Sequence, residues 1–226
     1  MPADFQRFAI YYTPAADSVF ARAGAAWLGW DAAQGRAVPH PELGLDLAPL
    51  TETPRKYGLH GTLTPPMRLA CPVPAFLKAV ETLAADMDPV PLGRLQLRPM
   101  DGFLAIVPDA QPRALTDAAA RIVQELDPYR AALTDHDLAR RRKAGLSARQ
   151  DALLLRWGYP YVMDEFRFHI TLSGKCASAQ MADALRAAHA WFDPALAQDH
   201  HLDALCVFGE GGDGRFHLLT RFAMRG

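Results

Sequence analysis

The same order of structural elements is predicted twice along this chain of 226 residues, and this repetition constrains the fold more than any other feature. Each half begins with an apolar strand, at 8–12 and at 103–108, and continues with a helix, a second strand, another helix and a closing hairpin. The second strands contain His60 and His169, which lie 109 positions apart, and the hairpins give an almost equal offset. A near-constant offset indicates duplication of one α+β unit.

The duplication predicts an α+β fold of two pseudo-symmetric α/β lobes in a single domain. Lobe 1 covers about 1–100 and lobe 2 about 101–226, and their antiparallel sheets are expected to face a central cleft. The second lobe carries an additional helical segment at about 129–160, which the first lobe lacks. The sequence Pro65-Pro66 is expected to end the first histidine strand. Amphipathic helices are predicted at about 20–27, 73–85, 114–126 and 179–191.

Both second strands carry the string His-x-Thr-Leu, as His60-Gly61-Thr62-Leu63 and as His169-Ile170-Thr171-Leu172. Side chains alternate between the two faces of a strand, so the His and the Thr of each string share one face. Around the second copy the opposite face is apolar and would meet the core, through Phe166, Phe168, Ile170 and Leu172. A sheet face with two imidazoles, several hydroxyls and nearby cations suits phosphoryl chemistry.

Composition and charge exclude several classes of partner. The formal net charge of −1 gives no broad electrostatic footprint for long nucleic acid. No apolar run is long enough to span a membrane, and the N-terminus is not expected to be a signal peptide. Three cysteines without a C-x-x-C pair favour neither a disulfide framework nor a structural zinc site, so a reducing cytoplasm is the expected compartment. We expect a monomer that acts on a small phosphorylated sugar or nucleotide.

The paired motifs in two α+β halves resemble the 2H phosphoesterase superfamily, which includes the RNA ligase-like cyclic phosphodiesterases. Within it, the chain is similar to the DUF1045-like branch associated with bacterial phosphonate-utilisation operons. The resemblance implies that His60 and His169 are catalytic and that Thr62 and Thr171 bind the phosphoryl oxygens. The strings that carry the closer similarity are FAIYYTP, PRKYGLHGTLTPP, ARRRKAGLSARQ and RWGYPYVMDEFRFHITLSG.

The chemistry that these residues permit is acid–base catalysis. Hydrolysis of a cyclic phosphodiester needs a base that activates water and an acid that protonates the leaving oxygen, and histidine suits both roles. Threonine hydroxyls and a cation can stabilise the charge on the non-bridging oxygens. No cofactor and no metal is expected, because the His200-His201 pair would point to opposite faces of a strand. The sequence leaves open which of the two motif histidines is the acid.

Other residues are candidates for substrate binding. The branch is associated with a lysine directly after the first His-x-Thr-Leu string, where this chain has Thr64. Lys56 or Arg167 is therefore the expected substitute for that lysine as a phosphate ligand. Tyr11, Tyr57 and Tyr161 are the aromatic candidates, and Tyr11 ranks first because the opening strand should lie beside the histidine strands.

The helical segment at about 129–160 contains the basic run 140–143. One interpretation is a solvated helix face. The other is a lid in which Arg141 and Arg142 help to hold a second phosphate.

Three functions are compatible with these observations. The first is a metal-independent cyclic phosphodiesterase that hydrolyses a small sugar cyclic phosphate. The phosphonate association implied by the resemblance suggests 5-phosphoribosyl 1,2-cyclic phosphate as that substrate. The second is a 2′,3′-cyclic phosphodiesterase or 2′–5′ ligase that acts on RNA ends. The third is a non-catalytic phosphosugar-binding protein, although binding alone would not need an acid–base pair of histidines.

Overall fold

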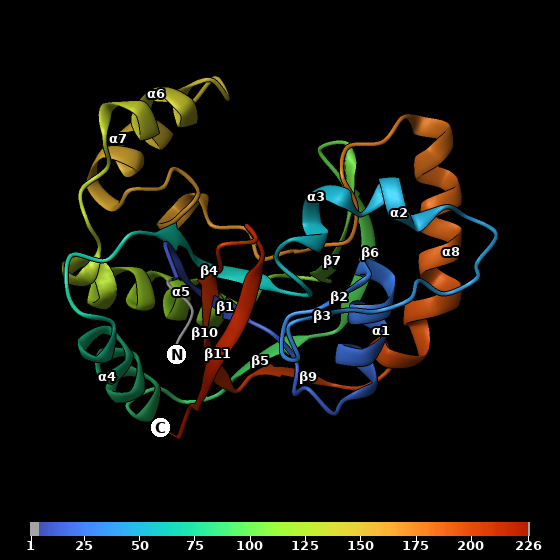
Figure 1. Ribbon diagram of the computed structural model, residues 1–226, viewed down its shortest axis with the longest axis horizontal. Coiled ribbons are helices and arrows are strands. Elements are labelled where there is room, and N and C mark those ends of the chain that lie inside the picture. Colours follow the sequence, from blue (N-terminus) through green and yellow to red (C-terminus); the bar gives the residue numbers. More distant parts are fainter. Residues whose placement is uncertain (1–4, 226) are drawn as a thin grey trace.

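One antiparallel sheet of seven strands runs through the molecule. The fold was determined as a computed structural model, which describes residues 5–225. The strands of the sheet are β1 (Phe8–Tyr12), β4 (Gly61–Met67), β6 (Leu95–Met100), β7 (Phe103–Pro108), β8 (Ile170–Thr171), β10 (Ala204–Glu210) and β11 (Phe216–Ala223). They lie in the order β11-β10-β1-β4-β8-β7-β6, and every neighbouring pair is antiparallel (Figure 1).

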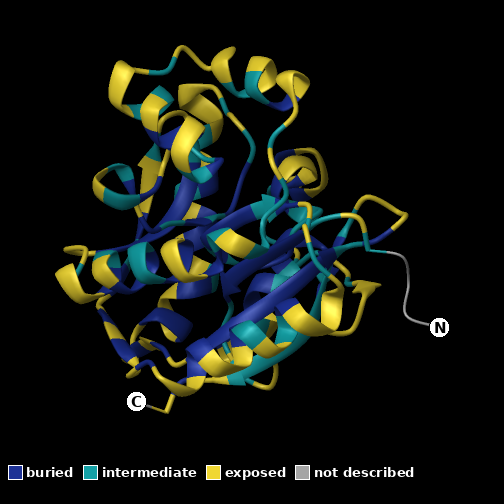
Figure 2. Ribbon diagram, turned by 90° about the vertical axis from the view of Figure 1, so that its left-hand side faces the viewer, coloured by how far each residue is buried: buried dark blue, intermediate teal, exposed yellow. Residues whose placement is uncertain are grey.

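Four long helices cover different parts of this sheet. Helix α4 (Val73–Ala85) packs against β10 and β11 at one end of the sheet, and α5 (Arg113–Leu126) packs against the central strand β4. Helices α1 (Val19–Leu28) and α8 (Ser178–Leu196) contact one another, and α8 covers β6 and β7. Each helix buries an apolar stripe at helical spacing, for example Phe76, Val80 and Leu83 in α4. Strands β1, β7 and β10 and the inner helix faces are largely buried, whereas the outer helix faces are exposed (Figure 2).

Shorter elements complete the fold. The two-stranded sheets are β2 (Trp30–Asp31) with β3 (Arg36–Ala37), and β5 (Val90–Gly93) with β9 (His200–Leu202). The other helices are α2 (Leu47–Leu50), α3 (Glu52–Arg55), α6 (Asp135–Arg142) and α7 (Ala148–Trp157), and single 3₁₀ turns lie at Asp127–Tyr129 and Met163–Glu165. Among the described residues, no helix combines the length and the apolar character needed to cross a bilayer.

The predicted α+β class and the antiparallel pairing are confirmed, but the strands do not form two facing sheets. Strands β10 and β11, from the end of the chain, lie beside β1, so residues of 1–100 and of 101–226 are mixed at that end of the sheet. The physical reason is that β1 is buried along its whole length and satisfies both of its edges, one with β4 and one with β10. The sheet is continuous through β4 and β8, and the duplication stays a prediction.

The first histidine strand does not end at Pro65-Pro66, as the sequence predicted. Strand β4 continues to Met67 because the pairing with β1 shifts register between Phe8 and Ile10. Proline lacks an N–H group and fits a strand at such an irregularity. Across this bulge the backbone N–H of Ile10 donates to the Thr64 hydroxyl at 3.0 Å, so the side chain replaces the missing ladder partner.

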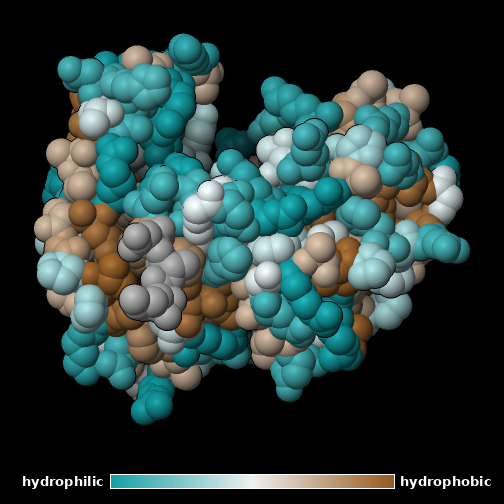
Figure 3. All heavy atoms as spheres, viewed as in Figure 1, coloured by the Kyte–Doolittle hydropathy of each residue, from teal (hydrophilic) through white to brown (hydrophobic). Residues whose placement is uncertain are grey.

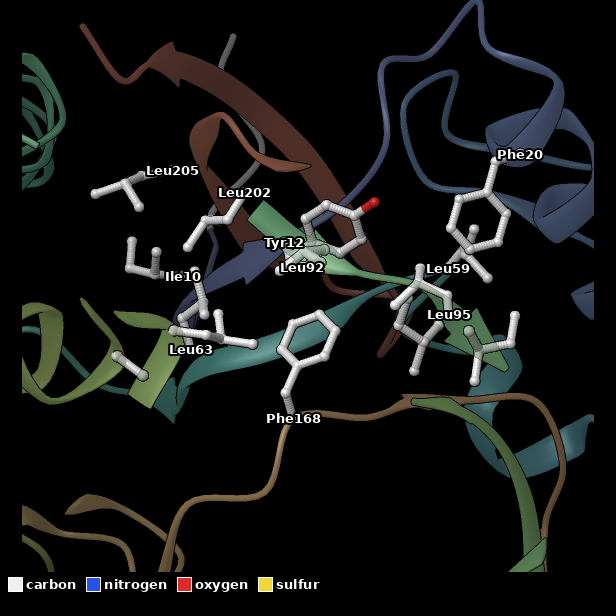
Figure 4. Packing of buried hydrophobic residues seen from close by; sticks show 14 of the residues in the cluster. Ile10, Tyr12, Phe20, Leu59, Leu63, Leu92, Leu95, Phe168, Leu202 and Leu205 are labelled. Carbon is white, nitrogen blue, oxygen red and sulfur yellow. The ribbon is translucent and has the colours of Figure 1, made fainter. Parts of the chain in front are cut away.

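The second histidine strand is shorter than predicted, although its alternation holds. Only Ile170–Thr171 belongs to the sheet, yet Phe166, Phe168, Ile170 and Leu172 are all buried. Phe168 packs edge-on against Tyr12 at a ring distance of 5.6 Å (Figure 4). A side chain at Gly61 would place its Cβ 2.6 Å from the Phe168 ring, so the glycine of the first motif is required by this packing.

Candidate functional site

The two His-x-Thr strings meet where β4 and β8 pair. Gly61 lies opposite Ile170 in the antiparallel register. This register sets His60 opposite Thr171 and Thr62 opposite His169, on the face that points away from the core. Side chains directly opposite one another lie about 5 Å apart at Cβ, and diagonal ones about 7–8 Å apart. Each histidine therefore neighbours the threonine of the other string, and the two imidazoles occupy diagonal corners of one cluster.

Both imidazoles are held in the same way by the backbone. Nδ1 of His60 lies 2.9 Å from the carbonyl oxygen of Gly58, and Nδ1 of His169 lies 2.9 Å from the carbonyl oxygen of Arg167. A carbonyl oxygen only accepts, so each Nδ1 carries a hydrogen and donates it. The Nε2 atom of each ring is left for the cleft. There it acts as an acceptor in the neutral ring and as a donor in the protonated one.

The surroundings of His60 favour its neutral form. Its ring packs against Tyr11 and Tyr57 at centroid distances of 4.2 Å and 5.3 Å. Burial lowers the pKa of His60 to about 4, against the hydrogen bond to Gly58, and the charge of His169 lowers it further. Burial also raises the pKa of Tyr11 well above its usual range, so this hydroxyl is neutral. At neutral pH, His60 therefore offers an unprotonated Nε2 atom.

The depressed pKa of His60 predicts its titration. In an NMR titration of the ring carbons, the His60 signal should move with a midpoint near pH 4, and His60→Gln should assign the signal by removing it. An unfolded chain binds this proton near pH 6.5. Acidification from pH 6.5 to 4 should therefore lower the free energy of unfolding, less so in the variant. A His60 midpoint at or above pH 6.5 would contradict this environment.

Two adjoining cavities flank the histidine cluster. They share Thr62, Pro65 and Tyr159, so they meet at the first motif threonine. The cavity on the His60 side measures about 520 Å³ and is lined by Arg7, Tyr11, Thr53, Pro54, Lys56, Tyr57, His60, Thr62, Pro65, Pro66, Arg140, Arg141, Tyr159 and Thr171. The cavity on the His169 side measures about 420 Å³ and is lined by Thr62, Leu63, Pro65, Met100, Asp101, Phe103, Gln150, Tyr159, Tyr161, Val162, Glu165, Phe166, Arg167 and His169.

The surface is hollowed between two parts of the molecule. In Figure 3 a hollow separates the residues over α6 and α7 from those over α2, α3 and α8, which Figure 1 labels in the same view. Helices α6 and α7 belong to the predicted helical segment at about 129–160, and residues of this segment line both cavities. The segment thus forms one wall of the candidate site.

Most of the predicted binding residues line these cavities, and one does not. Tyr11, Lys56, Tyr57 and Arg141 line the cavity on the His60 side, and Arg167 lines the other. The structure does not place the other predicted residue, Arg142, at either cavity. Its exposed guanidinium forms a two-pronged ion pair with Asp151 of α7, at 2.7 Å and 3.0 Å, and lines neither cavity. Adjacent residues of a helix point in different directions, so Arg141 faces the cavity while Arg142 faces Asp151. The basic run in the sequence does not indicate which arginine takes which direction.

Residues that sequence reasoning did not select as candidates also line the cavity on the His60 side, among them Arg7, Arg140 and Tyr159. Arg7 lies just before β1, Tyr159 follows α7, and Arg140 lies in the last turn of α6. Arg7 and Tyr159 are far from the motifs in the sequence, so no local pattern marks them. Arg140 belongs to the basic run, but its place beside the cavity depends on how α6 packs.

The remaining histidines show no metal-binding arrangement. Among residues 5–225, no group of three or more His, Cys, Asp or Glu side chains could hold a metal ion. His200 is buried, with Nε2 3.1 Å from the carbonyl oxygen of Ala195 and its ring against Phe20. His200 therefore has a structural role where β9 meets α8.

Comparisons with known proteins place the chain in one family. The family described as "Protein of unknown function (DUF1045)" matches residues 62–217. Two similar proteins are named "Ribose 1,5-bisphosphate phosphokinase PhnN". That of Janthinobacterium sp. (strain Marseille) is 38% identical over 90% of this chain and 47% of its own length. That of Laribacter hongkongensis (strain HLHK9) is 33% identical over 95% of this chain and 51% of its own length. This chain thus spans about half the length of these relatives.

A solved structure titled "Crystal structure of phosphoesterase" was also found. It has a TM-score of 0.45 and 14% sequence identity, and the match covers 99% of this chain and 100% of that one.

Proposed function

We propose that this chain, which belongs to the DUF1045 family, acts on phosphoesters in phosphonate metabolism, as a metal-independent cyclic phosphodiesterase. The observation that carries the proposal is the cluster of His60, Thr62, His169 and Thr171 across one strand pair. Two imidazoles that present Nε2 from diagonal corners of one cluster suit in-line hydrolysis better than they suit binding alone.

The different surroundings of the two histidines support different roles for them in the proposed reaction. His60 is neutral at pH 7, so its Nε2 atom is the base that takes a proton from the attacking water. His169 has a more exposed ring, and it is the acid in the proposal. As the water oxygen bonds to phosphorus, the P–O bond of the ring breaks and the leaving oxygen takes the proton from His169 Nε2. The product is a phosphate monoester, and exchange with solvent returns the proton to His169.

The threonines complete the proposed site. Thr62 lies at the junction of the two cavities and Thr171 lines the cavity on the His60 side. Their hydroxyls would donate to the non-bridging oxygens as negative charge develops. Lys56, whose Nζ lies 4.6 Å from the centre of the Tyr57 ring, adds a cation to the same cavity. Arg167 adds one on the other side.

The names of the relatives favour a particular substrate and product. Those proteins are named for phosphorylating ribose 1,5-bisphosphate, and this chain matches about half of their length. The sequence contains no G-x-x-x-x-G-K-[ST] string, the phosphate loop of P-loop kinases, so we do not carry the kinase activity over. Cleavage of the P–O2 bond of 5-phosphoribosyl 1,2-cyclic phosphate yields ribose 1,5-bisphosphate. The proposed reaction would therefore supply the compound in the relatives' name.

The test compares kcat/KM of the wild type on 5-phosphoribosyl 1,2-cyclic phosphate and on adenosine 2′,3′-cyclic phosphate. We expect the ribose compound to be the better substrate. Preference for the nucleotide would favour action on RNA ends. Calorimetric binding of the ribose compound without turnover would favour the phosphosugar-binding alternative and would contradict the proposal.

Removal of divalent metal is expected to leave turnover unchanged. The described residues provide no cluster of metal ligands, and the proposed chemistry uses only side chains. The check is the hydrolysis rate before and after dialysis against EDTA, with the apo sample also assayed after addition of Zn²⁺, Mn²⁺ or Mg²⁺. Loss of turnover that a divalent ion restores would overturn the metal-free mechanism.

A further inference from the structure

Four cationic side chains from three separate segments line the cavity on the His60 side. Two of them have carboxylate partners. Arg7 forms a two-pronged ion pair with Glu210 at 2.5 Å and 2.6 Å, and Arg140 lies 3.0 Å from Asp137. Within residues 5–225, neither Lys56 nor Arg141 forms an ion pair with a carboxylate. The cavity therefore has more positive than negative charge around it, and it can accept an anion besides the one held at the histidines.

Arg141 has the environment of a guanidinium built to bind an anion. Its Nε atom is buried and has no hydrogen-bond partner among the described residues. Its guanidinium lies 5.0 Å from the centre of the Tyr159 ring, which fixes its position. Burial lowers the pKa of Arg141, and the nearby charges of Arg140 and Arg7 lower it further. Burying the Nε–H donor of a charged guanidinium without a partner costs folding free energy. An anion that accepts two hydrogen bonds from the guanidinium would offset this cost.

We propose that Arg141 is the specificity residue for a second phosphate group, a phosphate monoester at the end of the substrate remote from the cyclic phosphate. The inference rests on the proposed function and extends it to the substrate class. The preferred substrate is a compact sugar with two phosphates. One phosphate lies at His60 and His169, and the other lies in the same cavity beside Arg141, in the last turn of α6. A cavity of about 520 Å³ is of the size that holds such a molecule.

The neighbouring Arg142 provides a matched control. It has the same charge and lies in the same helix turn, but it is exposed and paired with Asp151. Replacement of Arg141 and replacement of Arg142 change the net charge of α6 equally. A difference in kcat/KM between the two variants therefore reflects the position of Arg141 at the cavity, and not the overall positive charge of α6.

The test measures kcat/KM of the wild type, Arg141→Ala, Arg141→Lys and Arg142→Ala on two substrates. These are 5-phosphoribosyl 1,2-cyclic phosphate and ribosyl 1,2-cyclic phosphate, which lacks the terminal phosphate. Arg141→Ala should lose about 10–100-fold on the first substrate, chiefly through KM, and should keep its rate on the second. Arg141→Lys should lose less, because it keeps the charge but not the fork of donors. Arg142→Ala should match the wild type on both. Equal losses of Arg141→Ala on both substrates would overturn the inference.

A binding measurement separates failure of this inference from failure of the proposed function. Calorimetric titration with ribose 5-phosphate probes the second phosphate site without any turnover. The wild type and Arg142→Ala should bind it with the same affinity, and Arg141→Ala should bind it at least 10-fold more weakly. If the wild type hydrolyses neither cyclic phosphate, the proposed function fails, and this titration still decides the role of Arg141. Equal affinities in all three proteins, or absence of binding to the wild type, would refute the inference.

Discussion

Replacing His60 or His169 by alanine is expected to lower the kcat of cyclic phosphate hydrolysis by about 10²–10⁴-fold, the usual contribution of a general acid or base. Each ring is fixed by a backbone carbonyl that accepts from Nδ1, so each presents Nε2 to the cleft. Loss of His60 removes the acceptor for the proton of water, and loss of His169 removes the donor to the leaving oxygen. Steady-state assays at saturating substrate measure both effects.

His189→Ala is the matched control for these two variants. His189 is an exposed histidine of α8 whose Nδ1 lies 3.0 Å from an Asp193 carboxylate oxygen, and it lines neither cavity. Its replacement should leave kcat unchanged. Near-wild-type rates in both motif variants would contradict the proposed roles, provided that their circular dichroism and melting temperatures match those of the wild type.

Replacing Thr62 or Thr171 by valine is expected to lower kcat by about 10–10³-fold. Valine keeps the shape of threonine and removes only the hydroxyl, so the change tests the donor to the developing charge. The loss should appear in kcat more than in KM, because this hydrogen bond strengthens in the transition state. An increase in KM at constant kcat would instead show that the hydroxyls only bind the ground state.

Thr64→Val separates this catalytic effect from a structural one. Thr64 lies on the same strand, is 3% exposed, and accepts from the backbone N–H of Ile10. Valine at this position should leave a buried donor unsatisfied and lower the free energy of unfolding by about 1–3 kcal/mol. Chemical denaturation measures that loss, and kcat should not change at a temperature where the variant is folded. If Thr64→Val lowered kcat as much as Thr62→Val does, the purely structural role of Thr64 would be contradicted.

Local features of this fold could be predicted from the sequence. The bounds of β1 and α4 agree with the predicted strand and helix, because an apolar strand closed by Pro14 and an amphipathic run after Pro72 are local signals. The alternation around His169 predicted which side chains face the core, and the buried set agrees with it. Period-2 alternation follows from strand geometry, so it does not depend on which strands become neighbours.

Long-range pairing could not be predicted in the same way. The position of β10 next to β1 joins Tyr11 with Cys206, which lie in opposite halves of the chain. Continuation of β4 through its two prolines depends on a bulge against β1, which only the paired strand reveals. Arg7 was missed for the same reason: it precedes β1, and the pairing of β1 with β10 brings it against Glu210 beside the cavity.

The basic run shows where sequence and structure diverge at the site itself. From the sequence, Arg141 and Arg142 were equivalent candidates. In the structure Arg142 is paired with Asp151, whereas Arg141 lies against Tyr159 and has no carboxylate partner among residues 5–225. Ion pairs between neighbouring helices and the direction of a single helix turn decide this difference, and neither leaves a signature in composition or spacing.

The most direct test of the central claim is a ³¹P NMR time course with 5-phosphoribosyl 1,2-cyclic phosphate in the presence of EDTA. The wild type should convert the cyclic phosphate resonance into a phosphate monoester resonance, and in H₂¹⁸O one ¹⁸O atom should enter that monoester. The double variant His60→Ala/His169→Ala should leave the cyclic resonance intact over the same period. A cyclic resonance that persists with the wild type, or that decays equally fast with the double variant, would contradict the claim that the two His-x-Thr strings form a hydrolytic site.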